Sequence, residues 1–470
     1  MYLKKFVMSF SHLKYLKIVF WISLFSFLAC KKSFLDDKPK SSIVIPENLS
    51  DMTALLDNGS LIGSTPELGI ISADEYYYPN LGAFNSVATK TERNCYTWET
   101  DIYQGELNIP DWNDPYKVVF YANVVLTQLE KLPEVEKVSE QGKYVKAWAL
   151  FARSYAFFNL VQIFSPAYNK ATASTDLGIP LRLTSNVNNI EQRANVRDTY
   201  DRIVSDLESS LSLFSDKFPT QNRNRPSKAS AYGLLSRIYL SMREYDKALD
   251  ASNNSLQVYN KLIDYNLLDL TSIQPFTKYN DELILLSTGS PSYDAAIVGY
   301  GISTIDPTLI QLYDEDDLRR QIYFNYTGDS YLMKVGYNGG AGYHAFTGLA
   351  VDEIYLIKAE CLCRNGDLEG AKLILNNLLV KRYKTGRYIT FSATSQVDVL
   401  SKILLERRKE LVWRGLRWTD VKRLNIEGFN ITLKRNLGGK IYELPPNDPR
   451  YVMPIPDYEI NLSHIQQNLR

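Results

Sequence analysis

Two stretches of the chain share one pattern, AYGLLSRIYLSMREYDKALD at 231–250 and IYLIKAECLCRNGDLEGAKL at 354–373. In each, a short polar break separates two segments with helical periodicity. An alanine, Ala248 or Ala371, stands where the second helix must approach the first. Small residues at helix crossings are typical of tetratricopeptide hairpins. The pattern predicts a mainly α-helical fold with tetratricopeptide-like hairpins forming one scaffold; ordinary packing of unrelated helices is the alternative.

Further helices are expected before the first of these hairpins. The ranges 112–132 and 196–214 carry apolar residues at three- and four-residue steps. The range 143–164 is apolar almost all round, which is typical of a helix inside a bundle.

Two long insertions interrupt the helical pattern, at 59–115 and 264–347. Both are rich in Gly, Pro, Asn, Ser and Tyr, and short apolar runs such as Leu283–Leu286 predict a few strands. The first insertion falls in an N-terminal helical part (30–230) and the second in a C-terminal part (231–470) of one domain. Long non-helical segments on a rigid frame often carry binding sites.

The N-terminus has the pattern of an export signal. Four lysines precede a short apolar run from Ile18 to Ala29, and residues 1–29 contain no Asp or Glu. The run is too short to span a bilayer core, which needs about 20 apolar residues. Its end, Phe27-Leu28-Ala29-Cys30, resembles a lipobox, so we expect residues 1–29 to be a lipoprotein signal peptide and Cys30 to be acylated. A buried N-terminal helix of a cytosolic protein is the alternative.

The charge of the chain argues against nucleic-acid binding, and its cysteine content argues against a disulfide framework. Removal of residues 1–29 leaves 49 basic and 53 acidic residues, a net charge of −4 with no basic stripe. This composition lacks the electrostatic signature of nucleic-acid binding. Cys95, Cys361 and Cys363 remain, an odd and sparse set that predicts no disulfide framework.

Several motifs in a fixed order carry a resemblance to a known family. They are Phe34-Leu35-Asp36, Trp112…Tyr116…Asn123, Arg153–Leu160 preceded by Ala147, Gly178–Leu181, Tyr200–Leu207, Glu353–Glu360, Glu406–Leu411, Gly415–Asp420 and Pro454–Ile460. With them, the chain from Cys30 to Arg470 resembles the SusD/RagB family of nutrient-binding outer-membrane lipoproteins of Bacteroidetes. The resemblance implies a helical scaffold with the ligand site on an elaborated face. It also implies a SusC-like TonB-dependent transporter as partner, and a glycan or, in some members, a peptide as ligand.

No catalytic, metal or cofactor site is predicted. Glu406 and Glu410 lie one helical turn apart, but the cations around them favour ionised carboxylates in a salt-bridged helix. After signal removal only His344 and His464 remain, too few for a zinc set or a base–nucleophile pair.

The high tyrosine content is the feature of the sequence that points to ligand binding: the chain has 33 Tyr against 19 Phe and 6 Trp. Because a tyrosine hydroxyl needs a hydrogen-bond partner when buried, the excess suggests rings at surfaces, where they stack on sugar C–H faces. Candidate ligand-binding residues are Tyr76, Tyr77, Tyr78, Trp98, Asp74, Tyr293, Tyr300 and Tyr337, with Tyr323, Tyr326 and Tyr331 in the same clusters. The alternative is that these rings pack the insertions against the scaffold.

We therefore expect an outer-membrane lipoprotein, anchored through lipid on Cys30, that binds an extracellular nutrient and catalyses nothing itself. One alternative is a surface glycoside hydrolase, which needs two carboxylates across a cleft; Asp74, Glu75 and Glu99 are the residues available. The other is a periplasmic tetratricopeptide adaptor that binds a protein or peptide in the grooves of its hairpins.

Overall fold

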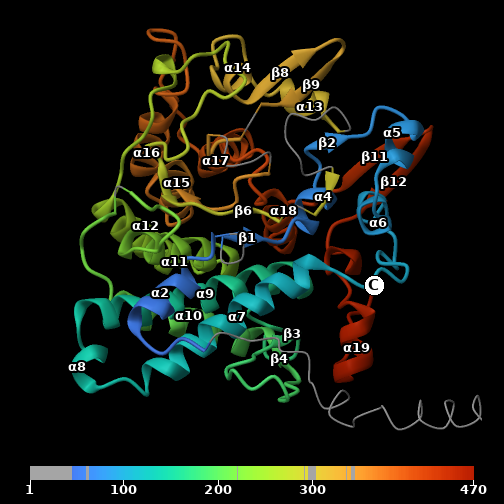
Figure 1. Ribbon diagram of the computed structural model, residues 1–470. Coiled ribbons are helices and arrows are strands. Elements are labelled where there is room, and N and C mark those ends of the chain that lie inside the picture. Colours follow the sequence, from blue (N-terminus) through green and yellow to red (C-terminus); the bar gives the residue numbers. More distant parts are fainter. Residues whose placement is uncertain are drawn as a thin grey trace, which may run out of the picture. The chain divides into compact units, whose positions relative to one another are not determined.

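The scaffold is a run of helices in which each helix from α7 to α17 packs on the next, while α18 packs on α11 (Figure 1). It comprises α7 (Pro110–Leu129), α9 (Glu140–Phe164), α10 (Val196–Leu211), α11 (Lys228–Met242), α12 (Tyr245–Val258), α15 (Val351–Arg364), α16 (Leu368–Leu379), α17 (Gln396–Glu410) and α18 (Arg417–Ile426). α9 packs between α7 and α10 and is buried on nearly every side. The prediction of a mainly helical scaffold with a buried helix at 143–164 is confirmed.

The two repeated stretches fold into equivalent hairpins, α11–α12 and α15–α16. Arg243 ends α11 with φ +62, and Gly366, at the same position of the repeat, has φ +89. The next backbone N–H, on Glu244 or Asp367, reaches back to the preceding helix and donates to a carbonyl of its last turn. Ala248 and Ala371 are fully buried, as close helix approach requires. A left-handed residue closes both turns, a common way to end a helix.

The computed structural model describes residues 45–59, 63–219, 221–290, 292–294, 303–334, 336–339 and 344–470. Pro46–Arg470 form one compact unit. In this described part, no helix is both long enough and apolar enough to cross a bilayer. The predicted signal peptide and Cys30 lie outside the described residues, so their assignment stays a prediction.

The two insertions, far apart in sequence, pair with each other. β1 (Ser64–Thr65) runs parallel to β6 (Thr288–Gly289), and β2 (Tyr76–Tyr77) antiparallel to β7 (Thr304–Ile305). The other pairs are β3 (Leu177–Pro180) with β4 (Arg193–Asn195), β5 (Leu283–Leu285) with β10 (Leu349–Ala350), β8 (Phe324–Thr327) with β9 (Ser330–Met333), and β11 (Leu433–Leu437) with β12 (Lys440–Leu444). The strand expected at Leu283–Leu286 is therefore confirmed, and the two insertions form one body.

Short helices complete the chain, several of them inside the insertions. They are α2 (Leu49–Leu56), α4 (Leu68–Ser72), α5 (Leu81–Ser86), α6 (Lys90–Tyr96), α8 (Glu134–Lys137), α13 (Pro307–Ile310), α14 (Arg319–Tyr323) and α19 (Asp457–Ser463), with 3-10 turns η2 (Tyr265–Leu267) and η4 (Pro449–Tyr451). The insertions are thus less loop-like than expected. Side-chain caps explain some of these helices: Asn80 accepts a hydrogen bond from the Ala83 N–H, and Thr89 from that of Glu92.

A buried network of charges joins the second insertion to α17. Arg319, fully buried, donates to Glu406 at 2.6 Å and to Glu410 at 2.9 Å. Arg382 donates to the other oxygen of Glu410 and to Glu282, both at 2.6 Å. Burial alone would raise the pKa of Glu406, but the nearby cations, Arg319 first, lower it to about 2. The structure confirms that Glu406 and Glu410 belong to a salt-bridged helix.

Substitution of Arg319 by methionine tests this network. The variant keeps the length of the side chain but leaves Glu406, Glu410 and Asp317 buried with fewer cations. Removal of one partner of a buried ion pair costs about 3–5 kcal/mol. We expect a loss of that size in the free energy of unfolding, measured by urea denaturation. Arg387→Met, at a position where the side chain is 67% exposed, should change stability little; equal losses in both variants would contradict this role of Arg319.

Candidate functional site

Most of the aromatic residues proposed as ligand contacts lie in the interior. Tyr76 and Tyr78 are 2% and 1% exposed, and their rings pack edge-on to each other and against Tyr96 and Trp413. The Tyr76 hydroxyl donates to the backbone carbonyl of Ile71 at 2.9 Å. The expected surface exposure of Tyr76 and Tyr78 is wrong, because their rings form the core of the insertions and a backbone carbonyl satisfies the Tyr76 hydroxyl.

Trp98 is also buried, and an arginine from β11 holds it in place. Its indole N–H donates to the Ser72 carbonyl at 3.0 Å. The Arg435 guanidinium lies over the rings of Tyr96, at 3.8 Å from the centroid, and Trp98, at 5.1 Å. Arg435 also donates to the carbonyls of Ile71, Ala73 and Tyr76. Arg435 thus fixes the segment from which Tyr77 projects, a role that no local motif indicates.

Tyr293 and Tyr337 are both buried, and the hydroxyl of each donates a hydrogen bond to a carboxylate. The Tyr293 hydroxyl donates to Asp111 at 2.8 Å, and the Tyr337 hydroxyl donates to Glu282. The Arg414 guanidinium covers the Tyr337 ring, 3.7 Å from its centroid. Tyr300 lies outside the described residues. Ligand contact by any of these three stays a prediction, which the burial of Tyr293 and Tyr337 does not favour.

Three tyrosines on the paired strands of the insertions keep their rings at least partly at the surface. Tyr326 on β8 is 59% exposed, and Tyr331, its cross-strand partner on β9, is half-buried with the ring centroids 4.8 Å apart. Tyr77 is half-buried on β2, which pairs with β7, and β7 packs beside β9. These strands lie near one another at the upper right of Figure 1. We call Tyr77, Tyr326 and Tyr331 the tyrosine surface.

The neighbouring carboxylates are committed to other partners. Asp74 receives two hydrogen bonds from Arg417, at 2.7 and 2.9 Å, and one from Arg408 at 3.1 Å. Burial would raise the pKa of Asp74, but Arg417 and then Arg408 bring it well below its usual value. Glu75 is buried, accepts the Trp413 N–H at 3.0 Å, and its burial raises its pKa to about 7. Asp74, as a permanent anion tied to arginines, is unsuited to general acid chemistry.

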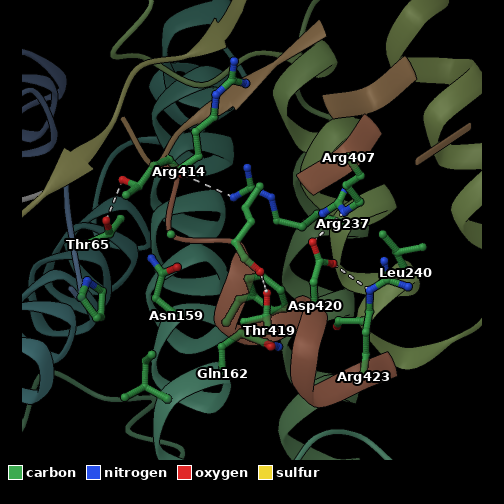
Figure 2. A pocket seen from close by; sticks show the side chains of 17 residues that line it. Thr65, Asn159, Gln162, Arg237, Leu240, Arg407, Arg414, Thr419, Asp420 and Arg423 are labelled. Atoms are coloured by element: carbon green, nitrogen blue, oxygen red, sulfur yellow. Dashed lines mark hydrogen bonds and ion pairs between the residues drawn. The ribbon is translucent and has the colours of Figure 1, made fainter. Parts of the chain in front are cut away.

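A small interior cavity lies between α9, α11 and α18 (Figure 2). Its volume is about 60 Å³, well below the roughly 300 Å³ at which small-molecule sites begin. The arginines that line it are paired: Arg237 with Glu353, Arg407 with Asp420, Arg414 with Asp352, and Arg423 with Glu360 and Asp420. The cavity therefore has room for water but not for a sugar ring. Among the described residues, no group of His, Cys, Asp and Glu is arranged to hold a metal ion.

Comparison with known proteins identifies the family. Residues 33–240 match a SusD-like family described as starch-binding associating with outer membrane, and residues 351–469 match the SusD family. The chain belongs to the SusD/RagB family. Members are binding proteins and not catalysts; they are outer-membrane-associated lipoproteins of Bacteroidetes that work with SusC-type transporters in general.

Similar proteins share this chain's architecture over most of its length. "SusD-like protein P2" of Formosa agariphila is 24% identical, with 95% of this chain and 97% of that protein covered. A SusD superfamily protein from Bacteroides thetaiotaomicron matches with a TM-score of 0.73 at 23% identity, covering 90% of this chain and 100% of that one. A laminarin-binding SusD-like protein matches with a TM-score of 0.65 at 19% identity, covering 90% and 99%. At these identities the solved structures establish the fold of this family member.

Replacement of Glu75 by glutamine tests the buried carboxyl. The Glu75 carboxyl has a pKa of about 7 in the folded state and about 4.5 in the unfolded state. Between these pH values the folded state holds the proton and the unfolded state has lost it, so the free energy of unfolding falls as the pH rises. Glutamine mimics the protonated form and still accepts the Trp413 N–H. We expect Glu75→Gln to stabilise the protein by about 2–3 kcal/mol at pH 8 and by little at pH 4, in urea denaturation.

The matched control is Glu315→Gln, at an exposed turn. It should leave the pH dependence of stability unchanged. A Glu75→Gln variant that gains no more stability at pH 8 than at pH 4 would contradict the assigned protonation of Glu75.

Proposed function

We propose that this SusD/RagB family member is anchored in the outer membrane by lipid on Cys30, binds an extracellular glycan, and delivers it to a SusC-like TonB-dependent transporter. Family membership supports the class of function and the kind of partner. A glycan is favoured over a peptide because one of the two matching family descriptions refers to starch binding and one similar solved protein is described as laminarin-binding. The lipobox-like end of the leader supports the anchor.

The tyrosine surface is the observation on which the ligand-binding proposal rests. Most described tyrosines of the insertions are buried, whereas Tyr77, Tyr326 and Tyr331 on the paired strands, and Tyr279 outside them, are at least partly accessible. Arg320 donates to the Tyr331 hydroxyl at 3.0 Å, which fixes that ring before any ligand arrives. Apolar ring faces stack on the C–H faces of sugars, while the hydroxyls hydrogen-bond at the edges. Such a site selects shape more than charge, in keeping with a carrier that must later release its ligand.

Neither alternative gains a matching observation. A glycoside hydrolase needs one carboxyl with a raised pKa facing a second across a cleft. Glu75 has the raised pKa, but it is buried, and its neighbour Asp74 is held by two arginines. A protein-binding adaptor would use the grooves of the hairpins, whereas the family description that matches residues 33–240 refers to starch binding. We therefore propose that the chain binds and does not cut its ligand.

Ligand binding is tested with the tyrosine surface. The mature lipoprotein is probed on an array of soluble glycans that includes laminarin, with a peptide array in parallel. For any glycan bound, the double variant Tyr77→Ala/Tyr326→Ala should bind at least about tenfold more weakly, because loss of well-placed aromatic contacts costs more than 1 kcal/mol each. Its melting temperature should fall only slightly, because Tyr326 is exposed and Tyr77 is only half-buried. Phe429→Ala, at another exposed aromatic position (41% exposed), is the matched control.

Two results would count against this assignment. Unchanged glycan binding by the double variant would place the site elsewhere, and binding confined to the peptide array would overturn the glycan proposal.

Membrane anchoring is tested by metabolic labelling with palmitate. Cys30 is the proposed acyl acceptor, so the Cys30→Ser variant should lose the label. It should also leave the membrane fraction, because stable anchoring depends on the attached lipid chains. Cys95→Ser should keep the label because Cys95 is buried in the folded chain. Label retained by Cys30→Ser would refute the anchor.

A further inference from the structure

Arg320 lies beside the tyrosine surface and carries a charge that no described carboxylate neutralises. It is half-buried on α14, which packs against β8 near the top of Figure 1. Its Cζ atom is 5.9 Å from the centroid of the Tyr331 ring. Among the described residues, its one hydrogen-bond partner is the Tyr331 hydroxyl at 3.0 Å, whereas its neighbour Arg319 is paired with buried carboxylates. Most of the N–H donors of the Arg320 guanidinium therefore remain available.

The bond from Arg320 also determines what the Tyr331 hydroxyl can offer a ligand. Because this oxygen accepts from the guanidinium, its own hydrogen is left to donate, and no residue of the described chain receives it. The Tyr331 ring lies against that of Tyr326, which is 59% exposed. The edge of this ring pair thus presents mainly donors. A carboxylate or a sulfate only accepts hydrogen bonds, so it matches these donors better than a sugar hydroxyl, which also has a hydrogen to donate.

Two exposed carboxylates near the tyrosine surface oppose an anion. Asp329 lies in the turn between β8 and β9, and Asp306 follows β7, which packs beside β9. Neither forms a salt bridge with Arg320, so both act on a bound anion only through the solvent, where salt screens charges over about 8 Å. The direct contact with Arg320 therefore favours an anionic group, while these two carboxylates limit its affinity.

We propose that the tyrosine surface takes a glycan with an acidic group, a carboxylate or a sulfate ester, and that Arg320 and the Tyr331 hydroxyl bind this group. The rings supply the fit to the sugar, and the planar guanidinium supplies the parallel N–H groups that oxyanions accept. This inference rests on the proposed function and narrows its ligand from glycans in general to acidic ones. Arg320 thereby becomes a specificity-determining residue.

The test compares two pairs of probes that differ in charge. Oligogalacturonate is set against its methyl ester, and dextran sulfate against dextran. Affinities are measured by isothermal titration calorimetry of the mature lipoprotein in a detergent without sugar head groups. We expect at least one charged probe to bind more tightly than its neutral counterpart, and added salt to reduce the preference. The first pair tests a carboxylate and the second a sulfate ester.

Three variants locate the charge that causes this preference. Arg320→Gln keeps an amide N–H for the Tyr331 hydroxyl but removes the charge, so the preferred charged probe should bind about three- to tenfold more weakly. Asp329→Asn removes a repelling charge and should bind that probe about twofold more tightly. Arg197→Gln, at an exposed position on α10, is the matched control for the loss of one positive charge and should bind as the unmodified protein does.

The outcomes separate this inference from the proposed function. A preference for a charged probe that Arg320→Gln abolishes, and that Tyr77→Ala/Tyr326→Ala also weakens, would support the acidic ligand. Equal affinity for charged and neutral probes would overturn it, as would a preference that Arg320→Gln leaves intact or that Arg197→Gln reduces equally. Absence of binding by every probe would also overturn it for these acidic groups, while the glycan array decides the proposed function independently.

Discussion

Two buried guanidinium groups hold the second insertion against the helical scaffold. Arg319 and Arg382 share Glu410 between them, and each binds a further carboxylate, Glu406 or Glu282. Charges this deeply buried are tolerated only when each is paired in good geometry, and the loss of one leaves its partners uncompensated. The network therefore constrains position more than it adds stability. It sets where the strands of the insertion emerge, and so where the tyrosine surface stands relative to α17.

The tyrosines in the core of the insertions supply hydrogen-bond donors to buried backbone carbonyls. Loops and short strands leave many backbone carbonyls inside the protein, and these need donors. A tyrosine fills space with its ring and supplies a hydroxyl for such a carbonyl, as Tyr76 does for Ile71 and Tyr313 for Lys409. Phenylalanine would fill the same volume without satisfying the carbonyl. The tyrosine excess is therefore in large part structural, and only a minority of the rings are left for ligands.

A rigid scaffold that carries a small aromatic surface suits a carrier protein. Ring stacking and edge hydrogen bonds recognise the shape of a sugar without a fixed charge, so affinity stays moderate and release is feasible. The paired carboxylates nearby, Asp74 with Arg417 above all, stabilise the frame and are unavailable as acids. The geometry thus agrees with a family whose members bind ligands and do not transform them.

Local patterns in the sequence determined the helical hairpins, the buried helix at 143–164 and the family, because helical periodicity and turn residues act over a few neighbouring positions. Small residues at Ala248 and Ala371 and the left-handed turn at Gly366 are examples. Only the tertiary structure decided which tyrosines are exposed. Tyr76 and Tyr77 are adjacent in sequence, yet one is buried and the other half-buried, and the β7 residue that bonds to Tyr77 lies 227 positions further along the chain. Burial within an insertion depends on such distant partners, and no local pattern encodes them.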